Sequence, residues 1–167
     1  TVDGDAPDFT SVSANDDAYG VGETITISVT WDEAVISTDA ALTLSNGATA
    51  ALASGSGSPT LVFTYSVVEG DTVSTDLSVS GYTGTITDSA GGSAVAASGD
   101  LGDVTVDGDA PDFTSVTAID AAYGVGATIS ISVTWDEAVV STDAALSLSN
   151  GATAALASGS GSPTLVF

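Results

Sequence analysis

The sequence has no basic side chain: lysine, arginine and histidine are absent from 167 residues that include 22 acids, for a net charge of −22. Proteins bind nucleic acid through lysine and arginine against phosphate, so nucleic acid is excluded as a partner, and an anionic membrane surface is disfavoured. A Ser–His–Asp triad is impossible without histidine. The acids fall in predicted linkers and turns rather than in a cleft, so we predict that the protein is not an enzyme.

Cysteine and methionine are also absent, and no run of 18 apolar residues occurs. No disulfide can form, and we expect no membrane insertion in this segment. Apolar residues still make up 43% of the chain, enough to bury a core, so the sequence is not a disordered acidic tail. Because neither disulfides nor side-chain ion pairs can form, bound metal ions are the remaining means of cross-linking the fold.

The chain repeats itself: residues 1–63 recur as residues 105–167, a period of 104. Only seven of the 63 aligned pairs differ, and the two that lose charge are Asp17/Ala121 and Glu23/Ala127. We therefore predict a complete repeat over residues 1–104, with an acidic linker at its end. Residues 105–167 are the first part of a second repeat, which further chain or a neighbouring chain would complete, and we expect the sequence to be an excerpt of a longer protein.

Strand patterns fill the repeat. "ETITISVTW" alternates Ile25, Ile27, Val29 and Trp31 with threonine and serine, which is the period of a half-buried strand. "ALTLS", "TAALAS", "TLVFTYSVV", "TDLSVSG" and "YTGTITD" follow, separated by turn signals such as "SNG" and "SGSGSP". About seven short strands in roughly 100 residues indicate an all-β, Ig-like antiparallel β-sandwich. Trp31 and its counterpart Trp135 are in phase with the apolar face and are predicted core residues.

Three motifs in this order resemble the Ig-like tandem repeats of large bacterial cell-surface proteins, among them the cyanobacterial swimming-associated surface protein and biofilm-associated adhesins. The family patterns Asp-x-x-Ala-Pro, Phe-Ser-Glu-x-Val and Asp-x-Ala-Gly-Asn correspond here to residues 3–7, 31–35 and 88–92. Gly92 replaces the asparagine of the last pattern and lacks its side-chain oxygen. The resemblance implies an extracellular spacer or adhesive role, with calcium stiffening the joints between domains.

The acids themselves point to calcium. Oxygen ligands without histidine or cysteine select Ca²⁺ or Mg²⁺ over transition metals. In a seven-stranded sandwich, alternate loops return to the end at which the chain enters, and the outgoing linker meets the loops of the other end. We therefore expect structural Ca²⁺ sites, with affinities on the order of 10⁻⁴–10⁻³ M. The candidate ligands at the entry end are Asp3, Asp5, Asp8, Asp32, Glu33 and Asp88. Those at the exit end are Asp16, Glu69, Asp71, Asp103, Asp107, Asp109 and Asp112, and Asp136 and Glu137 repeat the pair of residues 32–33.

These observations together predict a structural repeat of a secreted or cell-surface adhesin or fibre protein, acting as a calcium-stiffened spacer or filament building block. Its expected partners are neighbouring repeats of the same chain and identical chains in a fibre. Two alternatives stay open at this point. One is a module that binds a surface or glycan through its threonine and serine stripe, and the other is a filament assembled by strand exchange between subunits.

Overall fold

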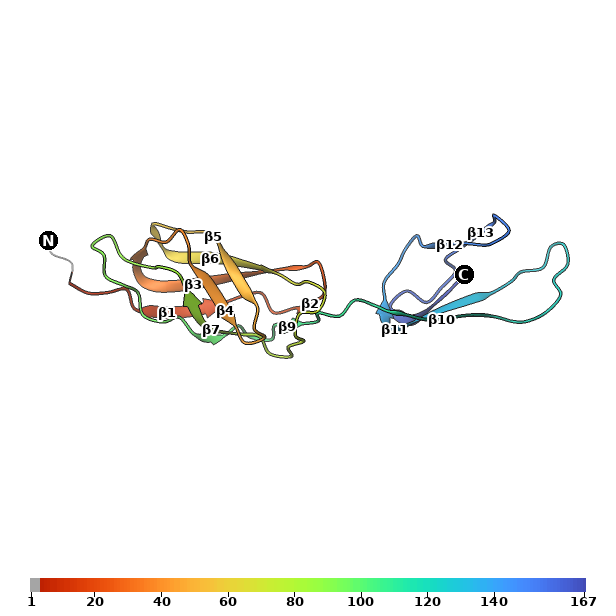
Figure 1. The fold of residues 1–167 in the computed structure, drawn as a ribbon, viewed down its shortest axis with the longest axis horizontal. Coiled ribbons are helices and arrows are strands. Elements are labelled where there is room, and N and C mark those ends of the chain that lie inside the picture. Colours follow the sequence, from red (N-terminus) through yellow and green to blue (C-terminus); the bar gives the residue numbers. More distant parts are fainter. Residues whose placement is uncertain (1–3) are drawn as a thin grey trace. The chain divides into compact units, whose positions relative to one another are not determined.

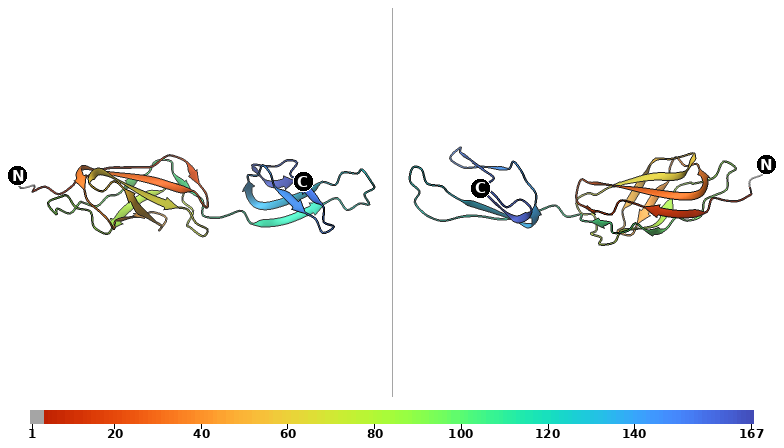
Figure 2. Two further views of the ribbon diagram at one scale, coloured as in Figure 1. Left: turned by 90° about the horizontal axis from the view of Figure 1, so that it is seen from above. Right: turned by 180° about the vertical axis from the view of Figure 1, so that it is seen from behind.

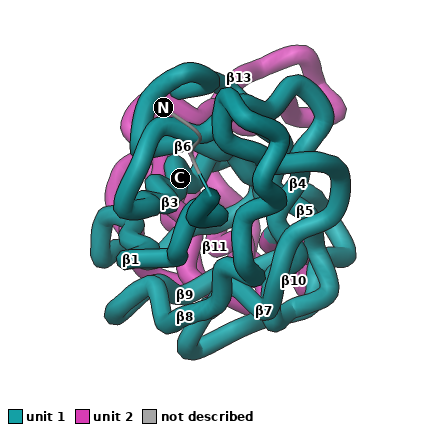
Figure 3. Tube along the Cα trace, turned by 90° about the vertical axis from the view of Figure 1, so that its left-hand side faces the viewer, with its two compact units in different colours: residues 1–110 teal, residues 111–167 magenta. Residues whose placement is uncertain are grey.

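The computed structural model describes residues 4–167, so Asp3 lies outside the described residues. The chain divides into two compact units, residues 1–110 (unit 1) and residues 111–167 (unit 2), shown in different colours in Figure 3. The described residues form strands and turns with no helix, which confirms the prediction of an all-β fold. No helix in this part of the chain has the length and apolar character needed to cross a membrane.

Unit 1 is built on one seven-stranded antiparallel sheet in the order β1-β3-β6-β5-β4-β7-β8 (Figure 1). Its strands are β1 (Phe9–Ser13), β3 (Thr24–Val35), β4 (Ala41–Leu44), β5 (Thr49–Ser54), β6 (Ser58–Ser66), β7 (Ser78–Thr83) and β8 (Gly99–Asp100). A separate parallel pair joins β2 (Ala18–Tyr19) to β9 (Thr105–Val106).

The sheet of unit 1 curls until it nearly closes into a barrel, as the two views of Figure 2 show. Its two edge strands approach each other: a Cβ placed on Gly99 of β8 would lie 2.8 Å from Val12 Cγ1 of β1. The structure therefore shows an all-β unit with a nearly closed sheet. The finer assignment, tandem Ig-like sandwiches, stays a prediction.

The interior of unit 1 is lined by the apolar side of the alternating pattern. Ile25, Ile27 and Val29 are fully buried, and Trp31 is 1% exposed, which confirms Trp31 as a core residue. The second half of the repeat adds further buried side chains to the same core: Leu77, Val79, Ile86, Ala94, Ala97, Leu101, Val104 and Val106. The core of unit 1 thus depends on both halves of the repeat.

One predicted strand is wrong. The stretch "YTGTITD", residues 82–88, does not form a strand of its own, because β7 ends at Thr83 and Gly84 turns the chain with a φ of +82°. Within residues 85–95, the backbone pairing is limited to isolated bridges of Thr87 to Ile36 and to Ser93. The change of direction places residues 85–95 as a loop at the entry end of the unit.

Unit 2 repeats the strand pairing of unit 1 in part. Its strands are β10 (Phe113–Ala118), β11 (Ile131–Val139), β12 (Ala145–Ser147), β13 (Thr153–Ala155) and β14 (Ser162–Val166). Phe113 pairs with Trp135 as Phe9 pairs with Trp31, including the irregularity that follows. The strands form a three-stranded sheet, β10-β11-β14, and a separate hairpin, β12-β13. The buried core of this unit contains Val133, Leu165 and Phe167.

Candidate functional site

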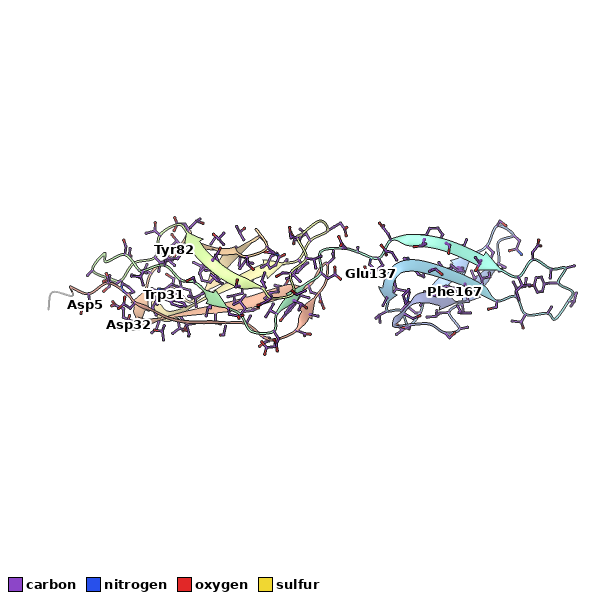
Figure 4. All side chains as sticks on the ribbon, turned by 90° about the horizontal axis from the view of Figure 1, so that it is seen from below. Asp5, Trp31, Asp32, Tyr82, Glu137 and Phe167 are labelled. Carbon is purple, nitrogen blue, oxygen red and sulfur yellow. The ribbon has the colours of Figure 1, made fainter. Side chains whose placement is uncertain are left out.

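Two acidic segments meet where the chain enters unit 1. The backbone N–H of Asp8 donates to Asp32 Oδ1 at 2.9 Å, and the N–H of Asp32 donates to the carbonyl of Asp8 at 3.1 Å. Figure 4 shows Asp5 and Asp32 at this same end of the unit. Glu33 follows at the next position and is half-buried. The structure thus brings the entry segment next to residues 32–33, as predicted, but these two residues lie within β3 (Thr24–Val35) and not in the predicted loop.

The same reciprocal pair recurs in unit 2. The N–H of Asp112 donates to Asp136 Oδ1 at 2.8 Å, and the N–H of Asp136 donates to the carbonyl of Asp112 at 3.1 Å, with half-buried Glu137 alongside. Asp112 therefore belongs to the entry end of unit 2 rather than to the loops of unit 1. In both units these two hydrogen bonds attach the incoming chain to a strand, β3 in unit 1 and β11 in unit 2. They use one carboxylate oxygen of Asp32 and one of Asp136.

Among the predicted ligands within residues 4–167, Asp88 is the least exposed. It is 3% exposed, in the loop that follows β7. Its Oδ1 accepts hydrogen bonds from the N–H groups of Ala90 (2.7 Å) and Gly92 (2.8 Å), and its own N–H donates to the carbonyl of Gly92. Its other oxygen, Oδ2, is buried without a hydrogen-bond partner. One oxygen thus fixes the conformation of the loop, and the other makes no hydrogen bond within the protein.

Gly92 leaves open the space next to this oxygen. A Cβ placed on Gly92 would lie 2.7 Å from Asp88 Oδ2 and 3.4 Å from the Cα of Ala6. The loop is tied to the same entry segment by a hydrogen bond from the N–H of Val95 to the carbonyl of Pro7 at 3.2 Å. The unpartnered carboxylate oxygen therefore lies beside the backbone that carries Asp5 and Asp8.

A cation fits this arrangement chemically. Burying an ionised carboxylate without a partner is unfavourable by several kcal/mol, and this sequence has no basic side chain to compensate it. Among the cations available from solution, Ca²⁺ and Mg²⁺ are the ones that hard oxygen ligands favour. Among residues 4–167, however, no group of three or more acidic side chains is already placed to hold a metal ion. Carbonyl groups, Asp5 and water would have to supply the other ligands.

At the exit end, the outgoing chain lies against the loops that the sequence assigns to it. The N–H of Asp103 donates to Asp16 Oδ1 at 3.1 Å, and the N–H of Asp107 donates to the carbonyl of Tyr19 at 2.9 Å. Further along, the N–H of Ala110 donates to Glu69 Oε2 at 3.0 Å. The structure therefore places the chain as predicted up to Ala110.

The acids of the exit end are held by backbone and hydroxyl groups. Asp107 Oδ1 accepts from the N–H of Asp109 at 3.2 Å. Asp71 Oδ2 accepts from the hydroxyl of Tyr65 (2.7 Å) and from the N–H of Val68 (2.8 Å). Burial first, and then the hydrogen bond to Asp71, raise the pKa of Tyr65 from 10.0 to about 12. These contacts give the exit carboxylates a structural role that does not require a metal.

Two glycines and one tyrosine have structural roles at these ends that the sequence pattern did not predict. Gly92 keeps the space beside Asp88 open, and Gly108 is buried so closely against the backbone of Asp71 that a side chain would not fit. Tyr65 joins the exit loop to Asn46, whose side-chain N–H donates to its hydroxyl at 3.1 Å. Two sequence signals mark the position of Gly92: the glycine pair in "AGG", and the absence of the asparagine that the family pattern has there.

Comparison of the chain with family models, curated proteins and solved structures finds no match. The candidate site therefore rests on its own geometry.

Proposed function

We propose that the protein is a structural module of a secreted or cell-surface protein, a spacer or filament building block of Ig-like β-sandwich repeats whose entry end binds Ca²⁺. The observation that carries this proposal is the buried, unpartnered Oδ2 of Asp88 beside the entry segment. A cation at this position supplies positive charge that no side chain of the protein can supply.

The residues around Asp88 explain how binding would stiffen the module. Asp88 belongs to a loop that already contacts the entry segment through the Val95–Pro7 hydrogen bond. The Asp8–Asp32 pair holds the same segment to β3. A cation held by Asp88 and by oxygens of residues 5–8 would add a third attachment, so the entering chain would lose freedom without any change in the sheet.

The extracellular assignment is supported by composition and resemblance. A chain without cysteine or basic residues has neither disulfides nor side-chain ion pairs, so millimolar calcium outside the cell is an available source of cross-links. The three motifs shared with bacterial surface repeats favour the same interpretation. Trp31 is in the core rather than on a surface, so it does not provide a platform for sugar binding.

Calorimetric titration with CaCl₂ at constant ionic strength tests the proposal. We expect the native chain to bind with a Kd on the order of 10⁻⁴–10⁻³ M. Gly92→Ala keeps every carboxylate, but its methyl group fills the space beside Asp88 Oδ2, so binding should weaken at least tenfold. The matched control is Gly20→Ala, where an added Cβ meets nothing within 4 Å and affinity should be unchanged.

Asp88→Asn provides the complementary test, because the amide oxygen can still accept the loop hydrogen bonds while the negative charge is removed. Loss of binding in both Asp88→Asn and Gly92→Ala places the cation at Asp88. Equal affinity in the native chain and both variants would contradict the proposal.

A further inference from the structure

The sequence predicts an acidic linker at the end of the first repeat, but residues 103–110, the leaving segment, are held by hydrogen bonds along their length. Alternate residues of this segment bond to opposite sides. On one side, the N–H groups of Asp103, Thr105 and Asp107 donate to Asp16 Oδ1 (3.1 Å), to the carbonyl of Asp17 (3.0 Å) and to the carbonyl of Tyr19 (2.9 Å). Every second residue is thus attached to the stretch of chain that contains β2.

The other side of the leaving segment bonds to residues 69–77. Val106 exchanges two main-chain hydrogen bonds with Ser74, at 2.8 and 2.9 Å. Its neighbours two and four positions away continue this pattern: the carbonyls of Val104 and Gly108 accept from the N–H groups of Leu77 and Gly70 (2.9 Å each), and the N–H of Ala110 donates to Glu69 Oε2 (3.0 Å). The leaving segment is therefore inserted between two other segments of unit 1.

The direction of the strands determines how tension would act on this arrangement. β9 runs parallel to β2. The chain enters unit 1 at the end where β1 begins and leaves it beyond β9, at the opposite end (Figure 1). Tension on the entering and leaving chain would therefore pull β2 back toward the entry end and β9 forward toward the exit end.

A parallel pair that is pulled in this way is sheared. The force acts along both strands and across their hydrogen bonds, so several bonds have to break together. When two strands are peeled apart instead, the bonds break one after another, and a smaller force is enough. Because β2 and β9 join the first and last parts of unit 1 directly, they lie on the shortest path for the load between the two ends of the unit.

We propose that unit 1 resists tension along the chain, and that the leaving segment is its load-bearing strand, held between β2 and residues 69–77. The function of the acidic segment is then mechanical, because its backbone transmits force into the fold. This inference rests on the proposed spacer role, since a spacer is stretched between its two ends. It is separate from the proposed cation, because the hydrogen bonds that hold the leaving segment involve no metal.

Constant-force spectroscopy of the full chain, held by tags at its two ends in EDTA, tests the proposal without calcium. Unfolding of unit 1 is recognised by its length, since residues 1–110 release about 360 Å of extended chain and residues 111–167 about 190 Å. Asp107→Pro removes the N–H that donates to Tyr19, and unit 1 should unfold about fivefold faster at the same force. The matched control, Asp107→Ala, loses the same carboxylate but keeps the N–H, so its rate should equal that of the native chain.

Two further variants separate mechanical resistance from overall stability. Asp16→Ala removes the acceptor of the Asp103 N–H without changing the backbone, and it should also accelerate unfolding under force. Gly84→Ala, in the turn after β7, should lower Tm but accelerate forced unfolding less than Asp107→Pro.

Equal rates for Asp107→Pro and Asp107→Ala, or unfolding rates under force that simply follow Tm across the variants, would overturn the proposal. Because every rate is measured in EDTA, either result leaves the calcium titration as an independent test of the cation site.

Discussion

Single carboxylates in this protein differ in what they can do, although the sequence presents them as one acidic set. Asp32 and Asp136 each use an oxygen to hold an incoming backbone N–H, and Asp71 accepts from a tyrosine hydroxyl and a backbone N–H. Asp88 alone among these four has a buried oxygen with no hydrogen-bond partner. Among these four carboxylates, the unpartnered oxygen therefore belongs to the most buried one.

Tyr65 provides a pH-dependent prediction at the residue scale. Its pKa in the fold is about 12, above the ordinary value of 10.0, because burial and Asp71 disfavour the phenolate. A raised pKa means that the stabilising contribution is fully present below about pH 10 and is lost as the pH rises through about 12. Tyr65→Phe should lower the free energy of unfolding by about 1–3 kcal/mol at pH 7, because the hydroxyl contacts are lost.

Denaturant unfolding at pH 7, 10 and 12 measures this effect. The native chain should lose stability more steeply than Tyr65→Phe above pH 10, so the difference between them should shrink. The chain has no lysine or cysteine, so tyrosines are the side chains that titrate there. The control, Tyr123→Phe in unit 2, should leave the pH dependence of unit 1 unchanged. A constant difference from pH 7 to pH 12 would contradict the assignment.

At the scale of elements, the turn at Gly84 ends β7 and directs the chain toward Asp88. Its φ is +82°, and a Cβ there would lie 2.5 Å from the backbone oxygen of Asp39. Gly84→Ala should destabilise unit 1 by about 1–3 kcal/mol for the backbone conformation, and more for the steric clash. Gly22→Ala measures the cost of the backbone conformation alone, because Gly22 has a φ of +91° and no atom lies within 4 Å of the added Cβ.

Thermal unfolding of the two glycine variants should therefore rank Gly84→Ala as clearly less stable than Gly22→Ala. Equal losses would mean that the loop moves away from Asp39 without penalty, and that the turn does not fix the position of Asp88.

The strands show what the sequence could and could not predict. Period-two alternation identified the buried face of β3, and the glycine- and serine-rich "SGSGSP" correctly marked the turn between β5 and β6. Residues 82–88 were predicted as one strand because their side chains alternate, but Gly84 interrupts them, and only its backbone conformation reveals that. Local pattern also does not distinguish Ile25, which is 0% exposed, from Ile129, which is 44% exposed.

The candidate site was predictable in outline only. Strand parity correctly brought Asp32 and the loop of Asp88 to the entry end, although Asp32 lies within β3 and not in a loop. The distinction between the two oxygens of Asp88 depends on the N–H groups of Ala90 and Gly92 and on the space beside Gly92. Those are packing details, which no spacing rule contains.

For the whole molecule, the dominant electrostatic term is repulsion. All 22 charged side chains are negative. Two carboxylates about 5 Å apart at an effective dielectric of about 20 repel by roughly 3 kcal/mol, and salt screens this effect. Salt weakens this repulsion, and the protein has no attractive side-chain ion pairs for salt to weaken. Raising NaCl from 0.01 to 1 M should therefore steadily increase the free energy of unfolding. Each kcal/mol gained should raise Tm by about 4–8 °C.

Differential scanning calorimetry in NaCl and in KCl at matched ionic strength measures this dependence, and the two salts should act alike. A Tm that falls with added salt would contradict the repulsive account.

The central claim, that Asp88 holds a calcium ion against the entry segment, is tested most directly by ¹H–¹⁵N NMR of the full chain during CaCl₂ titration at constant ionic strength. Residues 88–95 occur once in the sequence, so their signals have no counterpart from the second repeat. We predict saturating shifts concentrated at the N–H groups of Ala90, Gly92 and Val95. Shifts that grow without saturation across all acidic loops, or none in residues 88–95, would contradict the claim.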